Sequence, residues 1–202
     1  MTRDLSTLLA SDAVTIGTWT QIAAPELIDL LGRNGFDFTI FDAQHGPFGV
    51  ETAERLSRAA DANDMAAAIR LPTADPVGIM KALDAGIRHV VVPNLETAED
   101  AARIVAATRF GPEGLRGACP CCRSGGHYIR DWTRYVVEEE GRTGAIALVE
   151  TLEGVRNIAA IAATADLAAL MIGPFDLSVS MGHRGDWRHP DVADAVARMV
   201  DA

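Results

Sequence analysis

Short apolar runs alternate with segments of helical periodicity along most of this chain. Six runs have the length and composition of buried strands, at residues 14–19, 37–41, 66–71, 89–93, 145–150 and 168–172. Apolar residues at helical spacing occupy the intervals, at 24–31, 50–63, 76–85, 97–107, 131–140, 155–163 and 190–200. Regular alternation of strands and helices, with strands that are apolar throughout, predicts a parallel sheet.

The alternation is interrupted at residues 111–126, which are rich in Gly, Pro, Cys and Arg. This composition predicts an ordered loop. A seventh strand is a weaker expectation at residues 115–118 inside it.

Polar or aromatic residues close nearly every predicted strand. They are Trp19, Asp42, Arg70, Glu150 and Asp176. A βα repeat of about 25–30 residues with a ring of such residues favours a (β/α) barrel of TIM type, with a flavodoxin-like open sheet as the alternative. No linker or low-complexity tract interrupts the chain, so residues 1–202 are expected to form one domain.

Composition narrows the classes of function. Hydrophobic residues make up 49% of the chain, the formal net charge is −10, and no block of Lys and Arg is present, which argues against a nucleic-acid surface. The sequence shows neither a signal-peptide pattern nor an apolar stretch of the roughly 20 residues that span a membrane. Three clustered cysteines, Cys119, Cys121 and Cys122, are typical of a reducing compartment. We therefore expect a cytoplasmic protein.

Candidate catalytic groups follow the strands. Asp42 and His45 lie at the end of one strand, where α/β proteins bind ligands, although a polar strand end with a surface histidine has the same pattern. His45 is the best candidate for a general base, because only histidine titrates near neutrality unperturbed. Asp42 and Asp84 are both candidates for the acid that orients it, and Asp84 could instead be solvated on its helix.

Glu150 and Asp176 lie at the ends of consecutive predicted strands. Two carboxylates that meet there repel each other unless a cation lies between them, and oxygen ligands suit Mg²⁺ or Mn²⁺. The alternative makes Glu150 a salt-bridge partner and Asp176 a helix N-cap. Arg70 could bind a carboxylate or a developing oxyanion, or form an ion pair with Asp42 or Glu150.

Several motifs together resemble the HpcH/HpaI-type metal-dependent class II aldolases. The matching stretches, in chain order, are residues 17–19 (GTW), 42–46 (DAQHG), Arg70, 81–86 (KALDAG), 92–97 (VPNLET), 114–117 (GLRG), 149–151 (VET) and 173–178 (GPFDLS).

The resemblance implies a (β/α)8 barrel and aldol cleavage of a 4-hydroxy-2-oxo acid into pyruvate and an aldehyde. It implies a divalent metal, Mg²⁺ or Mn²⁺ with Co²⁺ as a further option, on Glu150 and Asp176, with pyruvate or its enolate chelating it. His45 would be the base with Asp84 raising its basicity, Asp42 would support it, and Arg70 would stabilise the enolate oxygen. The substrate-binding residues would be Trp19, Gln44, Leu148, Gly173, Pro174, Phe175 and Asp176. A homo-oligomer, dimer-based with a hexamer as one form, is also implied.

The chain departs from the family pattern at several points. Gln44 and Leu148 stand where the family often has Glu and Gln. The chain is about fifty residues shorter than members of the family, so we expect a seven-stranded barrel without the eighth βα unit. Two other functions stay open: a citrate-synthase-like condensation enzyme, and a non-catalytic relative that binds a small acid. A zinc site made from the cysteines and His127 is disfavoured by cramped spacing.

Overall fold

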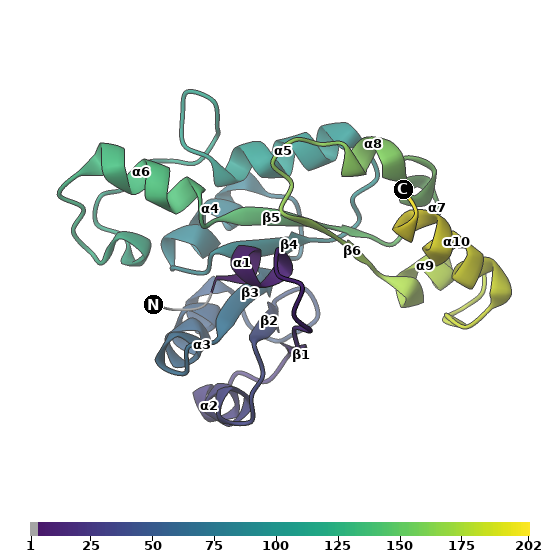
Figure 1. Ribbon diagram of the computed structural model, residues 1–202, viewed down its shortest axis with the longest axis horizontal. Coiled ribbons are helices and arrows are strands. Elements are labelled where there is room, and N and C mark those ends of the chain that lie inside the picture. The colour runs from purple at the N-terminus through teal and green to yellow at the C-terminus, as the bar shows by residue number, and fades with distance from the viewer. Residues whose placement is uncertain (1–3) are drawn as a thin grey trace.

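The computed structural model describes residues 4–202 as one parallel sheet with helices packed on it (Figure 1). The described strands are β1 (Gly17–Thr20), β2 (Phe38–Asp42), β3 (Ala66–Arg70), β4 (His89–Val92), β5 (Gly144–Val149) and β6 (Ala169–Ile172), and they pair in sequence order. All six expected strands are confirmed. The first begins later than expected, at Gly17, and Val14 is 89% exposed.

The described helices fill the intervals between strands. They are α1 (Leu5–Leu9), α2 (Pro25–Arg33), α3 (Val50–Ala62), α4 (Pro76–Asp84), α5 (Ala98–Thr108), the short 3₁₀ turn η1 (Arg123–Gly125), α6 (Trp132–Glu140), α7 (Leu152–Arg156), α8 (Ile158–Ala162), α9 (Pro174–Ser180) and α10 (Pro190–Val200). Asp75, Thr97, Asp131 and Thr151 cap their helices by accepting a backbone N–H with the side chain. The helix expected at 155–163 is divided between α7 and α8 at Asn157.

Two apolar layers sandwich the sheet, because successive side chains of a strand point to opposite faces. Phe41, Ile69, Val90 and Val149 pack on the side covered by the larger helices. Ile40, Ala68, Val91, Ile146 and Leu148 form an inner layer on the other side, which Leu5 of α1 joins. Figure 1 shows α1 in front of β3 and β4, away from α5 and α8.

The expected seventh strand is wrong. Residues 115–118 take part only in an isolated bridge between Phe110 and Arg116. Leu115 is 60% exposed, whereas Arg116 is buried against Asp84 and Glu139, so the segment is fixed by an ion pair rather than by a sheet. The described sheet therefore has six strands. It curls like part of a barrel and has β1 and β6 at its edges, so the described residues do not form a closed (β/α)8 barrel.

Two described helices were not expected, α1 and α9. Alpha-helix α9 begins at Pro174 directly after β6, and Pro is favoured in the first helical turn. Among residues 4–202, no helix combines the length and the apolar character needed to cross a membrane.

His89 is a titratable group buried at the start of the inner layer. Its Nε2 lies 2.8 Å from the Ser6 hydroxyl of α1, and its Nδ1 has no hydrogen-bond partner within residues 4–202. Burial lowers the pKa of His89 from 6.5 to about 4; the charge of Asp4 opposes this shift and that of Arg88 adds to it. The imidazole is therefore neutral in the folded protein near neutral pH.

The lowered pKa of His89 predicts that acid destabilises the fold. Between pH 6.5 and 4 the unfolded chain binds a proton that folded His89 rejects, so the free energy of unfolding falls as the pH falls. The contribution is on the order of 3 kcal/mol. Urea unfolding of H89Q, which keeps a hydrogen-bonding side chain, should show a shallower decline than the wild type over this range. H127N, at an exposed histidine, is the control and should decline like the wild type; equal slopes for H89Q and the wild type would contradict the prediction.

Candidate active site

A buried ion pair joins the ends of β2 and β3. Asp42 is opposite Arg70 in the register of these strands, and both side chains point into the inner side of the sheet. Arg70 donates from Nε to Asp42 Oδ1 at 2.9 Å and from Nη2 to Oδ2 at 2.7 Å. The two side chains are 2% and 12% exposed, so little water screens this bidentate pair.

Asp42 also organises the turn that follows it. Its Oδ1 accepts the backbone N–H groups of Gln44 at 3.1 Å and His45 at 3.2 Å, and its Oδ2 accepts Gln21 Nε2 at 2.7 Å. Burial alone would raise the pKa of Asp42, but hydrogen bonds from Arg70, Gln21 and His45 outweigh it and hold the pKa far below its usual range. Asp42 is therefore a permanent anion that fixes its neighbours.

Trp19 covers the other side of Arg70. The guanidinium carbon lies 4.6 Å from the centre of the Trp19 ring, a cation–π distance. Arg70 is held between a carboxylate and an aromatic face, so its orientation is fixed before any ligand binds.

Glu150 follows β5 and is buried, with 3% of its surface exposed. Its Oε1 accepts the backbone N–H of Asn94 at 3.1 Å. Burial is the main cause of its raised pKa; the Asn94 hydrogen bond opposes the rise, the charge of Asp176 adds to it, and the charges of Arg70 and His45 oppose it. Residues from four different βα segments thus influence the pKa of this buried carboxylate.

The close approach of the Glu150 side chain to the start of α9 depends on Gly173. A Cβ at position 173 would lie 2.6 Å from Glu150 Oε2 and 2.8 Å from Glu150 Cβ. Only a glycine leaves room for this carboxylate against the start of α9.

Asp176 lies in the first turn of α9 and is exposed. The alternative role as helix N-cap is wrong, because the N-cap is Gly173 and no side chain caps this helix. Asp176 therefore adds a second carboxylate beside Glu150 whose oxygens are not used in capping. Two carboxylates, one buried, form a donor set of oxygens that fits a hard divalent cation. Pro174 and the exposed Phe175 complete this turn.

His45 and Asp84 do not form the expected pair. His45 is exposed in the turn after β2, and its backbone rather than its ring contacts Asp42. Asp84 ends α4 and accepts Arg116 Nη2 at 2.9 Å. No hydrogen bond links Asp84 to His45 among residues 4–202. The Arg116 guanidinium is buried and therefore requires anionic partners, which are Asp84 and Glu139.

The two departures from the family pattern have different surroundings. Gln44 Oε1 is buried and has no hydrogen-bond partner among the described residues, so this amide oxygen is available to a ligand or a water. Leu148 is 3% exposed in the inner apolar layer, two residues before Glu150 on the same face. It gives the site an apolar wall.

Sequence reasoning missed two contributors, Gln21 and Asn94. Gln21 comes directly after β1, so its place at a strand end was a usable signal. Asn94 has a φ of 56° and donates its backbone N–H to Glu150. Its residue type does not predict this hydrogen bond, because every residue except proline has a backbone N–H.

The cysteine segment contains three free thiols. Cys119 and Cys121 are exposed, and Cys122 Sγ lies 3.1 Å from the Ser124 hydroxyl. In residues 4–202 these cysteines and His127 form no group close enough to hold a metal ion.

The buried pair predicts a large loss of stability in D42N. This change removes the anion and leaves the Arg70 charge in a nearly closed site, which should cost about 3–5 kcal/mol in urea unfolding. The exposed pair between Glu51 and Arg55, at 3.0 Å, supplies the control, and E51Q should cost less than about 1 kcal/mol. Similar losses in the two variants would show that burial of the Asp42 pair is unimportant.

Comparison with known proteins identifies relatives of the whole described fold. A 5-keto-4-deoxy-D-glucarate aldolase from Salmonella arizonae is 37% identical over 188 residues, which are 93% of this chain and 73% of that protein. An HpcH/HpaI aldolase/citrate lyase family protein from Burkholderia cenocepacia superposes with a TM-score of 0.92 at 33% identity, covering 98% of this chain and 79% of that one. The citrate synthase SbnG superposes with a TM-score of 0.88 at 28% identity, over 98% and 76%.

A more distant protein shares the fold. The Mycobacterium tuberculosis protein CitE, solved with magnesium and pyruvate, is 20% identical with a TM-score of 0.58, covering 94% of this chain and 68% of that one. The family model for HpcH/HpaI aldolase/citrate lyase matches residues 15–202. Since that match includes all six described strands and every candidate site residue, the chain belongs to the HpcH/HpaI aldolase/citrate lyase family.

Proposed function

We propose that this protein is a divalent-metal-dependent aldolase that cleaves 4-hydroxy-2-oxo acids into pyruvate and an aldehyde. The aldolase relatives support a carbon–carbon lyase, and the metal and the substrate class are our proposal. The observation that carries it is the buried Glu150 carboxylate, whose pKa is raised chiefly by burial and is influenced by the charges of Asp176, Arg70 and His45.

Glu150 and Asp176 are the residues that would hold the metal. Their oxygens suit Mg²⁺ or Mn²⁺, with Co²⁺ as a further option, and a cation would relieve the repulsion that contributes to the raised pKa of Glu150. Magnesium in the CitE structure supports this choice. When bound, the metal supplies a Lewis acid that polarises the 2-oxo carbonyl.

Arg70 is suited to stabilise negative charge on the substrate oxygen. Nε and Nη2 are engaged by Asp42, which leaves Nη1 to donate to the oxygen that becomes anionic. Because Asp42 and Trp19 hold the guanidinium in place, this donor needs no reorganisation during the reaction.

His45 is the proposed general base. It would accept the proton of the 4-hydroxyl group as the C3–C4 bond breaks, so that C4 becomes the aldehyde carbonyl. The electron pair of that bond would pass into the enolate of pyruvate, whose oxygen Arg70 would stabilise, and a proton from solvent water added at C3 would complete pyruvate. Asp42 fixes the backbone at His45, whereas Asp84 accepts a hydrogen bond from Arg116.

The remaining residues shape the substrate site. Backbone N–H groups at Phe175 and Asp176, in the first turn of α9, are proposed to bind the carboxylate of the 2-oxo acid. Gln44 Oε1 offers an acceptor to a substrate hydroxyl, and Trp19 and Leu148 line apolar surface. Assembly as a dimer-based homo-oligomer remains a prediction.

SbnG favours a second candidate, a condensation enzyme of citrate-synthase type. Such an enzyme would use the same Arg70 and Glu150 groups with a different electrophile. Both candidates require an enolate, so enolate formation tests them together against a non-catalytic relative.

Exchange of the methyl protons of pyruvate is the direct test. Protein incubated with pyruvate and Mg²⁺ or Mn²⁺ in deuterated water should show metal-dependent loss of the methyl proton signal by NMR. E150Q keeps the side-chain shape but loses the charge, and its exchange rate should fall at least 100-fold. E138Q, at an exposed glutamate near the end of α6 that pairs with Arg134, is the control and should exchange like the wild type. Absence of exchange with either metal, in protein shown to be folded, would refute both enzymatic functions.

Gly173 provides a second test, of the metal site itself. The Cβ of G173A would collide with Glu150 Oε2 and displace the carboxylate, so Mn²⁺ affinity should fall at least tenfold in a titration followed by electron paramagnetic resonance. G49A is the matched control, because a Cβ there meets no atom within 4 Å and the backbone is extended. Unchanged Mn²⁺ affinity in G173A would remove Glu150 from the proposed ligands.

A further inference from the structure

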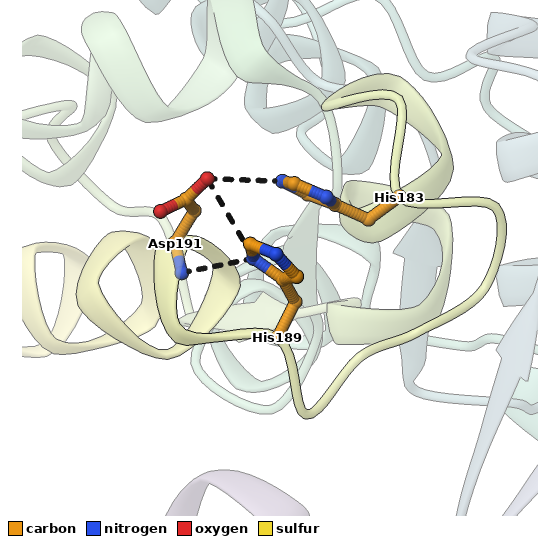
Figure 2. Close-up of side chains that lie close together, drawn as sticks. All are labelled: His183, His189 and Asp191. Carbon is orange, nitrogen blue, oxygen red and sulfur yellow. Dashed lines mark hydrogen bonds and ion pairs between the residues drawn. The ribbon is translucent and has the colours of Figure 1, made fainter.

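Two histidines and an aspartate meet between α9 and α10, in a part of the molecule that the proposed reaction does not use (Figure 2). His183 lies in the connection between these helices, His189 is the N-cap of α10, and Asp191 lies in its first turn. One ligand atom from each residue lies within 4.8 Å of the other two.

The shape of this cluster suits a small metal ion. His183 Nε2 lies 3.2 Å from Asp191 Oδ2, and His189 Nδ1 lies 3.6 Å from the same oxygen. The imidazole rings stack with their centres 3.6 Å apart and their planes at 17°. Ligand atoms of a tetrahedral zinc site are about 3.4 Å apart, as zinc–ligand bonds of about 2.1 Å require. The two nitrogen-to-oxygen distances are already close to that value.

Hydrogen bonding leaves one contact in this cluster unexplained. The Nδ1 atom of His189 accepts the backbone N–H of Asp191 at 3.3 Å, so it carries a lone pair rather than a proton. It nevertheless lies 3.6 Å from the anionic Asp191 Oδ2, with no hydrogen available between them. A cation bound to the Nδ1 lone pair would replace the 3.3 Å hydrogen bond from the Asp191 N–H and would relieve the repulsion between the two acceptors.

We propose that His183, His189 and Asp191 form a transition-metal site of the zinc class, with water as a fourth ligand. The set of two imidazole nitrogens and one carboxylate oxygen selects Zn²⁺, Ni²⁺ or Cu²⁺ over Mg²⁺, in contrast to the all-oxygen pair of Glu150 and Asp176. Side-chain exposures of 22%, 35% and 61% leave the ion an entry path and room for the water.

A metal here would hold the connection between α9 and α10. That connection contains Gly182, Arg184 and Gly185 at positive φ, and a Cβ at Gly185 would lie 3.0 Å from the Phe175 ring. The ion would thus have a structural role, holding this connection against the start of α10.

Zinc binding by the tag-free full chain, stripped of metal with a chelator, tests the proposal by isothermal titration calorimetry with ZnCl₂. H189S keeps a capping oxygen at the start of α10, and H183Q keeps a hydrogen-bond donor toward Asp191, but each removes a zinc ligand. Each variant should lose one zinc-binding event or weaken it at least 100-fold. Thermal melting should show a zinc-dependent rise in Tm for the wild type that both variants lack.

Two control variants separate this site from the others. H127N removes an exposed histidine beside the cysteines and should bind zinc like the wild type, while E150Q should keep the His183 site even if the catalytic metal is lost. Circular dichroism shows whether each variant is folded. If H183Q or H189S is unfolded, D191N is measured in its place, and it should bind zinc at least tenfold more weakly than the wild type. Zinc affinity within threefold of the wild type in both H183Q and H189S, or in D191N where it replaces one, would overturn the proposal.

Discussion

The bidentate pair between Asp42 and Arg70 is the constraint on which the candidate site depends. It joins neighbouring strand ends, and its burial makes it strong only while both partners are present. The same Asp42 carboxylate fixes the turn that carries Gln44 and His45, and Arg70 in turn packs against Trp19. Groups from three βα units are thereby held in one arrangement before a ligand arrives, which is what electrostatic preorganisation requires.

Glu150 differs from Asp42 in that no bidentate ion pair among the described residues neutralises its charge. Burial and the charge of Asp176 raise the pKa of Glu150. The hydrogen bond from the Asn94 N–H and the charges of Arg70 and His45 oppose this rise. The inner face of the sheet places apolar side chains such as Leu148 beneath Glu150, which keeps the local dielectric low. In the proposed function a cation would relieve the repulsion between the Glu150 and Asp176 carboxylates, and the missing side chain of Gly173 leaves room for the Glu150 carboxylate.

The two ends of α9 differ in the chemistry they offer. Its first turn carries Asp176 beside Glu150, a set of hard oxygen donors, whereas the connection beyond it leads to His183, His189 and Asp191, which include softer nitrogen donors. Because metal ions differ in the donor types they prefer, the two proposed sites would take different ions from one solution. A Cβ at Gly185 would lie 3.0 Å from the Phe175 ring, so this glycine lets the connection pass close to the first turn of α9.

The amino-acid sequence by itself determined the alternation of strands and helices and the strand-end positions of Asp42, Arg70 and Glu150, because the periodicity of hydrophobic residues is a local property of the chain. It also carried the motifs that identify the family. Tertiary structure decided the pairings. Asp84 binds Arg116 rather than His45, because the buried Arg116 guanidinium requires carboxylate partners and the fold places Asp84 and Glu139 next to it. The same contacts hold residues 115–118, which form one isolated bridge and no strand. The roles of Asn94 and Gly173 and the meeting of His183 with His189 likewise depend on distances between atoms, which no spacing along the chain records.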